Sequence, residues 1–230
     1  MWLVAAAHGL SLPALPRLDQ PVELKRSHGF SAAANWLVPG HVLLGAIPNK
    51  GRGSTLDRVR AICESGCRTF VSLQAELPPL DSDLPFPAWT STSEREGRMY
   101  LVDARACCTE PQFVRFPIDD LQPASSVEWL SETVADIANR VRKGETLYIH
   151  CFAGRGRTGL VAACLLGELY EGMEAAEALE RVSTYYRLRA SFCVSASRAQ
   201  DGMSPETEPQ RQQVRDFFSA RALERSDATR

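Results

Sequence analysis

The sequence predicts an α/β fold, a single domain whose strands form one mostly parallel sheet. Two observations support this prediction. Short runs rich in Val, Ile, Leu and Phe, bounded by Gly, Pro or Asp, are typical of strands. Between these runs, apolar residues recur every three or four positions, as they do on one face of a helix. Since strands and helices alternate along the second half of the chain, helical connections between parallel strands are expected.

The first strands follow an N-terminal leader. Residues 1–34 contain scattered prolines and are expected to be irregular. Residues 35–38 and 41–45 are apolar runs separated by Pro39 and Gly40. This arrangement predicts two strands joined as a hairpin.

The middle of the chain alternates between a helix, a strand and a loop. Residues 56–63 place apolar side chains on one helical face, and Gly66 is a natural C-terminal stop. Residues 69–73 predict a short apolar strand. Residues 74–97 are rich in Pro, Ser and acidic residues and predict a long loop, with a short strand at 100–102 within or after it.

The next strand and helix are better marked. Residues 113–118 form a strand-like run. Ser125 and Glu128 have the spacing of a capping box, which predicts the start of a helix. An apolar face then follows over residues 127–141, and Gly144 is expected to end the helix.

Composition restricts the class of protein. The chain has 230 residues, 44% of them hydrophobic and 23% charged, as expected for a globular protein with a substantial core. Its formal net charge of −2 argues against a protein dedicated to nucleic acid or to anionic membranes. No apolar run is long enough to span a bilayer, and residues 2–7 lack the preceding positive charge of a secretory signal. Membrane insertion is therefore not expected.

The cysteines favour a reduced compartment. There are seven, an odd number, and their spacings do not include the paired pattern of a metal site. A cytoplasmic location, with the nucleus as the alternative, suits them better than a disulfide framework. No sequence pattern indicates an oligomeric state.

The most informative stretch is residues 150–159, with the sequence HCFAGRGRTG, which we call the signature loop. It lies between a strand-like run at 146–149 and a helix-like run at 160–170. Arg157 follows Cys151 by six positions, a spacing that none of the other six cysteines has. The alternative interpretation is a buried structural cysteine in a glycine-rich turn. The strand before the loop and the helix after it favour the functional interpretation.

Each feature of the signature loop suits the attack of a thiolate on a phosphate monoester. A thiolate needs a positive environment to exist near neutral pH. A glycine-rich loop that ends at a helix N-terminus turns its backbone N–H groups toward an anion. The planar guanidinium of Arg157 can bind two phosphate oxygens at once, which a lysine ammonium does not do.

These residues resemble the signature loop of the cysteine-dependent protein tyrosine phosphatases, most closely of their dual-specificity branch. The resemblance extends from about Asn35 to Phe218. It implies a four- or five-stranded sheet with helices on both faces. It also implies a catalytic domain over residues 35–222, a polar tail at 223–230, and catalysis without a metal or another cofactor.

The resemblance assigns roles within the loop. It implies that Cys151 is the nucleophile, that Arg157 binds phosphate and that Thr158 assists breakdown of the cysteinyl-phosphate. His150 is expected to shape the environment of the cysteine. A Cys–His protease is not favoured, because no other histidine has the context of a catalytic triad. The rest of the phosphate-binding loop is formed by Phe152, Ala153, Gly154, Arg155 and Gly156.

Cleavage of the ester also needs a proton for the leaving oxygen. Asp119 and Asp120 lie on the expected loop after residues 113–118, where an acid can swing over the pocket. In the small dual-specificity phosphatases the acid is followed a few residues later by a proline, and Pro123 matches this position for Asp120. We therefore expect Asp120 to be the general acid, with Asp119 as the alternative.

Two other side chains have open roles. Gln210 lies in a segment that resembles the last helix of the family, where it would position the hydrolytic water. The alternative for Gln210 is an exposed residue at a helix start. Arg155 either presents its charge at the pocket rim, where it meets a second anionic group, or is tied to a neighbouring acid and holds the loop.

The expected function is hydrolysis of phosphate monoesters, with a phosphorylated protein as the partner and phosphotyrosine, phosphoserine and phosphothreonine as substrates. A non-protein substrate is the alternative: a phosphoinositide, a phosphoglucan or an RNA 5′-phosphate. A phospho-binding module without catalysis is disfavoured, because the nucleophile, the arginine, the threonine and an acid are all present.

Overall fold

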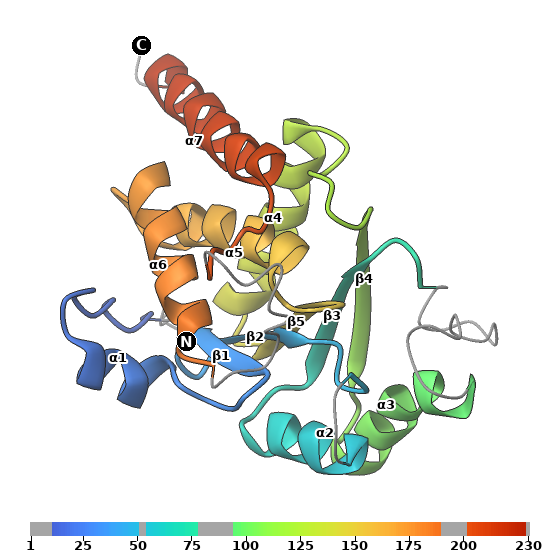
Figure 1. The fold of residues 1–230 in the computed structure, drawn as a ribbon. Helices are drawn as coiled ribbons and strands as arrows, with labels where there is room; N and C mark the ends of the chain where they lie inside the picture. The colour runs from blue at the N-terminus through green and yellow to red at the C-terminus, as the bar shows by residue number, and fades with distance from the viewer. Residues whose placement is uncertain (1–10, 51–53, 78–93, 190–201, 229–230) are drawn as a thin grey trace, which may run out of the picture.

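A five-stranded sheet in the order β1-β2-β5-β3-β4 forms the centre of the computed structural model (Figure 1). The structure describes residues 11–50, 54–77, 94–189 and 202–228. β1 pairs with β2 in the antiparallel direction, and the other neighbours pair in parallel, which confirms the predicted class. The strands are β1 (Ala34–Val38), β2 (Val42–Ala46), β3 (Thr69–Gln74), β4 (Gln112–Ile118) and β5 (Leu147–Cys151).

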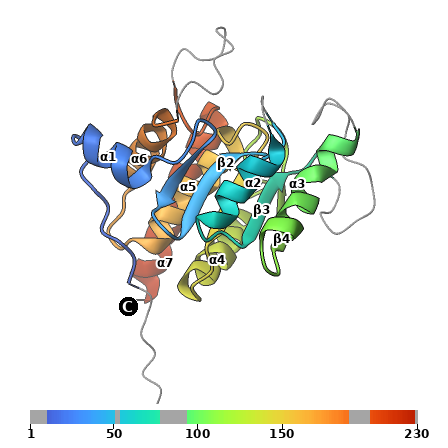
Figure 2. The same ribbon diagram turned by 90° about the horizontal axis from the view of Figure 1, so that it is seen from below.

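Helices cover both faces of the sheet, as Figures 1 and 2 show from two directions. One face is covered by α2 (Thr55–Glu64) and α3 (Glu94–Cys107). The short helix α1 (Pro21–His28) lies beside β1. No helix in the described ranges is long and apolar enough to cross a membrane. The other face is covered by α4 (Val127–Arg142), α5 (Gly156–Leu169), α6 (Ala175–Arg187) and α7 (Glu208–Ala228).

Side chains of the central strands alternate between two hydrophobic cores. Phe70 and Tyr148 point into the core beneath α2 and α3. Val71 and Ile149 point into the core beneath the other four helices. Each such buried side chain contributes about 1.5–3 kcal/mol. Because both faces of the sheet are covered, the strands are continuous apolar runs, and this made them visible in the sequence.

Glycines end the elements where the sequence predicts it. Gly40 has a φ of +77° in the turn between β1 and β2. Gly66 and Gly144 follow α2 and α4 with φ values of +97° and +87°. In this left-handed conformation other residues are strained, so these positions stop a helix or turn a hairpin.

Two predicted element types are wrong. Residues 1–34 include helix α1, which begins with Pro21, a residue tolerated there because the first N–H groups of a helix have no intrahelical partner. The strand expected at 100–102 lies within α3, since so short an apolar run does not distinguish strand from helix. The polar tail expected at 223–230 belongs to α7 as far as Ala228, and its polar character stays a prediction. Most of the predicted loop, residues 78–93, lies outside the described residues, as do residues 2–7.

Two helix starts also differ from the prediction. The cap of α4 is Ser126, whose Oγ accepts the N–H of Trp129, so the capping residue is one position later than Ser125. Helix α5 begins at Gly156, four residues before the expected start, and therefore includes the end of the signature loop.

A disulfide joins Cys63 of α2 to Cys108, just after α3. This pair corrects the expectation of reduced cysteines without disulfides. Its two members are separated by 45 residues, and their proximity follows from the packing of α2 against α3. Among the described cysteines, Cys67, Cys107, Cys151 and Cys164 are free.

Candidate active site

The signature loop connects β5 to α5 at the carboxyl end of the parallel strands, where ligands of α/β folds bind. Cys151 is the last residue of β5 and is 2% exposed. Its carbonyl accepts the N–H of Ile47 at 2.8 Å, which fastens the start of the loop to the segment after β2. A Cβ on Gly154, which has a φ of +66°, would lie 2.3 Å from the carbonyl of Gly45. Both the backbone conformation and the close approach therefore require glycine there.

The first turn of α5 contains Arg157 and Thr158, both buried. The N–H groups at a helix start lack intrahelical partners and favour an anion. The Thr158 hydroxyl is buried without a hydrogen-bond partner among the residues that the structure describes. Because an unsatisfied buried hydroxyl costs about 1–3 kcal/mol, Thr158 is expected to gain its partner when the site is occupied.

The guanidinium of Arg157 is 1% exposed and lies between two carboxylates. Glu76 accepts from it twice, with Nη1–Oε2 at 2.5 Å and Nη2–Oε1 at 2.9 Å. Asp120 accepts from Nη2 at 2.8 Å. Burial opposes the arginine charge, but the hydrogen bonds and ion pair with Glu76 outweigh it and keep the pKa of Arg157 above its ordinary value.

Sequence reasoning missed Glu76. It lies just after β3, in a turn held by Arg115, whose Nη2 donates to the carbonyls of Ala75 and Leu77 at 3.0 and 2.9 Å. Burial would raise the pKa of the Glu76 carboxyl, but the hydrogen bonds from Arg157 leave it below the ordinary value. A signal was available, because an acid after one parallel strand lies at the same sheet edge as a loop after its neighbour.

The structure brings Asp120, and not Asp119, to the signature loop. Both belong to residues 119–124, which we call the acid loop. The Asp120 side chain is 64% exposed and contacts Arg157. The Asp119 side chain is exposed and makes no hydrogen bond or ion pair within the described part of the chain. Of the two, only Asp120 has the position expected of the acid.

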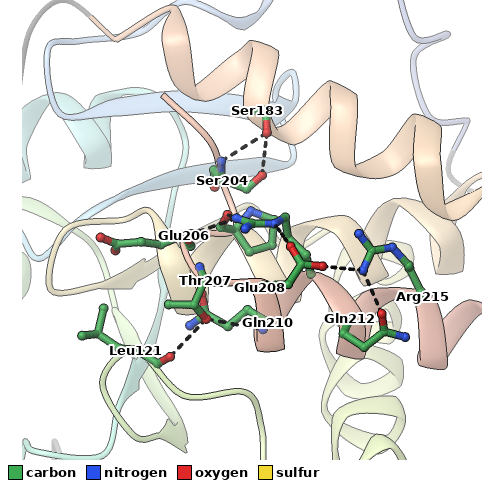
Figure 3. Close-up of polar contacts among 11 residues, drawn as sticks. Leu121, Ser183, Ser204, Glu206, Thr207, Glu208, Gln210, Gln212 and Arg215 are labelled. Carbon is green, nitrogen blue, oxygen red and sulfur yellow. Dashed lines mark hydrogen bonds and ion pairs between the residues drawn. The ribbon is translucent and has the colours of Figure 1, made fainter. Parts of the chain in front are cut away.

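Helix α7 and the residues before it hold the acid loop in place (Figure 3). The Thr207 hydroxyl donates to the Leu121 carbonyl at 3.1 Å. Gln210 donates from Nε2 to the Gln122 carbonyl at 3.0 Å. These bonds fix the loop backbone on the C-terminal side of Asp120, so a movement of the acid is left mainly to its side chain.

Gln210 is fully buried beside the signature loop, which contradicts the alternative of an exposed helix start. A Cβ on Gly156 would lie 3.0 Å from Gln210 Oε1. Oε1 also accepts the N–H of Thr207 at 3.1 Å. The amide therefore connects the signature loop, the acid loop and the start of α7, and its role in positioning water stays a prediction.

Arg155 is tied to the C-terminal segment. Its Nε donates to the Met203 carbonyl at 2.7 Å, and its Nη1 lies 3.4 Å from a carboxylate oxygen of Glu206. The side chain is 11% exposed. The Ser204 hydroxyl donates to the Arg155 carbonyl at 2.8 Å. The Ser183 hydroxyl in turn donates to the Ser204 carbonyl and accepts the Ser204 N–H (Figure 3). Arg155 therefore holds the loop through its partners in the C-terminal segment. The alternative prediction, that Arg155 presents an unpaired charge at the pocket rim, is wrong.

His150 is fully buried, and its Nε2 lies 3.2 Å from the hydroxyl oxygen of Tyr100 on α3. Burial lowers the pKa of His150 to about 3. The ring is therefore neutral near pH 7 and suits the expected part in shaping the environment of Cys151. Tyr100 was missed in the sequence, where it was assigned to a strand.

Arg189, also missed, supports the other side of the signature loop. It is 9% exposed, and its Nη1 donates to the Gly154 carbonyl at 2.9 Å. Its Nε donates to Asn35 Oδ1 at 2.6 Å. A buried guanidinium thus holds the carbonyl of Gly154 in place within the loop.

The arrangement combines a buried cysteine, an arginine held by a carboxylate, the N-terminus of a helix and an exposed acid. Such a set can bind a tetrahedral dianion, attack it and supply a proton. The described residues contain no cluster of three or more His, Cys, Asp or Glu side chains suited to a metal ion.

Comparison with known proteins places the site in context. The family model of the "Swiss Army Knife protein, DSP-PTPase phosphatase domain" (PTP-SAK) matches residues 31–214. Protein 067L of Invertebrate iridescent virus 3, named as a candidate tyrosine phosphatase, is 30% identical over 95 residues. That match covers 35% of this chain and 40% of the viral protein, so the chain spans less than half of that relative.

Solved structures show the same fold at low sequence identity. Tk-PTP in its active form is 22% identical with a TM-score of 0.52, over 81% of this chain and 97% of that one. Kinase associated phosphatase, with its catalytic cysteine replaced by serine, is 18% identical with a TM-score of 0.55, over 79% and 87%. Human DUSP28 is 14% identical with a TM-score of 0.53, over 92% and 99%.

Proposed function

The chain belongs to the PTP-SAK family of dual-specificity-type phosphatase domains, and on this premise we propose that it hydrolyses phosphate monoesters of proteins through a cysteinyl-phosphate. Phosphotyrosine is the proposed substrate, together with phosphoserine and phosphothreonine. The observation that carries the proposal is the guanidinium of Arg157, held by Glu76 at the helix start that follows Cys151.

The first step forms a sulfur–phosphorus bond. The Cys151 thiolate attacks phosphorus in line, while Arg157 and the loop N–H groups bind the equatorial oxygens. The bond between phosphorus and the ester oxygen breaks, and the oxygen takes the electron pair. Asp120 gives this oxygen its proton, so the product leaves as a neutral alcohol or phenol.

The second step releases phosphate. Water attacks phosphorus and gives a proton to the Asp120 carboxylate, and the sulfur–phosphorus bond breaks with its electron pair on sulfur. The Thr158 hydroxyl, which is buried without a described partner, donates a hydrogen bond to the leaving sulfur. The cycle ends with inorganic phosphate, the thiolate and a protonated Asp120.

The ion pair between Asp120 and Arg157 explains why the acid becomes available only after substrate has entered the site. Asp120 occupies an Nη2 donor that a phosphate oxygen would use. Its exposed side chain can leave as substrate enters, whereas Glu76 keeps the guanidinium in place with two hydrogen bonds. Substrate binding therefore displaces the Asp120 carboxylate from Arg157, and the released carboxyl takes up a proton from water before it protonates the leaving oxygen.

The charges around the loop support a protein substrate with one phosphate at the site. Arg155 is paired with Glu206, and Arg157 with Glu76 and Asp120. A substrate with several phosphates, such as a phosphoinositide, would meet these carboxylates at close range and be repelled. This favours phosphorylated side chains over a phosphoinositide, a phosphoglucan or an RNA 5′-phosphate.

A substrate panel tests the proposal. Phosphotyrosine and phosphothreonine peptides, an inositol phosphate and a phosphoglucan are assayed with the parent and with Cys151→Ser. We expect the peptides to be the best substrates, vanadate to inhibit and EDTA to have no effect. Preference for the inositol phosphate or the glucan would overturn the substrate class. Phosphate binding without turnover of any substrate would favour a binding module.

A further inference from the structure

We propose that Lys50 and Phe152 form a recognition element that binds an acidic side chain next to the phosphorylated residue of a protein substrate. The proposal rests on the proposed function, and it names a specificity determinant for the same site. It replaces Arg155, which is tied to Glu206, as the residue that meets a second negative group.

Lys50 lies on a turn that is fastened to the nucleophile. The Ile47 N–H donates to the Cys151 carbonyl at 2.8 Å, and the Lys50 N–H donates to the Ile47 carbonyl at 2.9 Å. These two bonds fix the backbone of residues 47–50 beside the start of the signature loop. The position of the Lys50 backbone is thus tied, through Ile47, to Cys151 at the end of β5.

The ring of Phe152 holds the ammonium. Phe152 directly follows the nucleophile, and the Lys50 Nζ lies 3.9 Å from the centre of its ring. Both side chains are half-buried. An aromatic face attracts an ammonium group electrostatically, but it does not accept conventional hydrogen bonds from the N–H groups as an oxygen atom does. The contact therefore orders the ammonium and leaves its donors available.

No carboxylate in the described ranges pairs with Lys50, in contrast to the two arginines of the signature loop. Its positive charge is therefore available to a substrate. The two acids that contact Arg157, Glu76 and Asp120, oppose a highly charged ligand at the signature loop. The element therefore suits one carboxylate better than several phosphates. An Asp or Glu that flanks the phosphorylated residue provides that single charge.

Two phosphotyrosine peptides that differ in one position test this. One carries Asp next to the phosphotyrosine and the other carries Asn, and both are assayed with the parent and three variants. The parent is expected to prefer the acidic peptide in kcat/KM on the order of threefold, the size typical of a partly solvated ion pair. This preference should decrease at high salt.

Lys50→Ala should remove the preference by raising KM for the acidic peptide more than for the neutral one. Lys50→Glu should reverse it. Lys143→Ala, at an exposed lysine just after α4, is the matched control and should keep the parent's preference.

The outcomes separate this inference from the proposed function. If the parent hydrolyses both peptides equally, or if Lys50→Ala loses activity equally on both, the recognition element is refuted and the phosphoprotein function stands. If neither peptide is hydrolysed while an inositol phosphate is, both are refuted. A Tm equal to that of the parent for Lys50→Ala and for Lys50→Glu would show that both variants are folded.

Discussion

Glu76→Gln is expected to misplace the guanidinium of Arg157, although glutamine has nearly the same size and shape as glutamate. In the structure each Glu76 oxygen accepts a hydrogen bond from the guanidinium. A glutamine amide has one acceptor oxygen, and its NH₂ group would face an arginine N–H, a donor against a donor. The variant therefore loses one hydrogen bond, gains a repulsive contact and removes a charge from beside a buried cation.

The magnitude follows from these contacts. A hydrogen bond to a charged group contributes about 1.5–3 kcal/mol, and removing one partner of a fully buried ion pair costs about 3–5 kcal/mol. The Glu76 side chain is 20% exposed and Asp120 still pairs with Arg157, so a smaller loss of about 2 kcal/mol is expected. In a chain of 230 residues this lowers Tm by about 4–8 °C. A misplaced guanidinium should lower kcat/KM about 10- to 100-fold.

Thermal unfolding and hydrolysis of an aryl phosphate at pH 7 measure both effects. Glu64→Gln is the matched control, because Glu64 is the exposed last residue of α2 and its loss should change stability by less than about 0.5 kcal/mol. If Glu76→Gln has the parent's Tm and activity, Glu76 does not hold Arg157. A rise in activity would mean that Glu76 competes with the substrate, which also refutes the reasoning.

Three other predictions follow from the structure. Asp120→Asn should lower kcat about 10²–10⁴-fold and flatten the basic limb of the pH–rate profile, whereas Asp119→Asn should cost far less; the opposite result would reassign the acid. Reducing the Cys63–Cys108 bond, with its 45-residue separation, should cost about 4 kcal/mol of stability, and Cys63→Ser should show no such response; equal Tm values with and without reductant would contradict this. Because the folded pKa of His150 is about 3 and the unfolded value about 6.5, protons bind preferentially to the unfolded chain in this window. Stability should therefore fall as pH decreases from 6.5 toward 3, and His150→Gln should reduce this slope in thermal unfolding; parallel curves would contradict it.

Features that depend on local sequence were predictable. The buried strands are apolar runs, and the glycines after α2 and α4 mark helix ends through their backbone conformation. Cys151 and Arg157 could be identified from the sequence because both lie in one short loop, where they are six positions apart. The choice of Asp120 over Asp119 also came from a local pattern, the proline that follows.

Features that depend on distant contacts were not predictable. Glu76 is separated from Arg157 by 81 residues, and Arg189 from Gly154 by 35. The role of Arg155 was undecided because its acid partner, Glu206, lies 51 residues away. Only the packing of the sheet, α5 and α7 determines which of the many charged residues meet.

The helix α3 shows a different limit. Its residues 100–102 are apolar, but three residues do not reveal whether the period is that of a strand or of a helix. Tyr100 and Ala104 are buried and four positions apart, a helical spacing. That pattern becomes clear only once the buried face is known.

The central claim is that phosphate passes through Cys151. The most direct test is to mix the parent with an aryl phosphate, stop the reaction within one turnover and identify the phosphorylated residue by peptide mapping and mass spectrometry. The account predicts phosphate on the sulfur of Cys151 and none in the Cys151→Ser variant, which should have no turnover. Phosphate on another side chain, or turnover that persists in the serine variant, would contradict it.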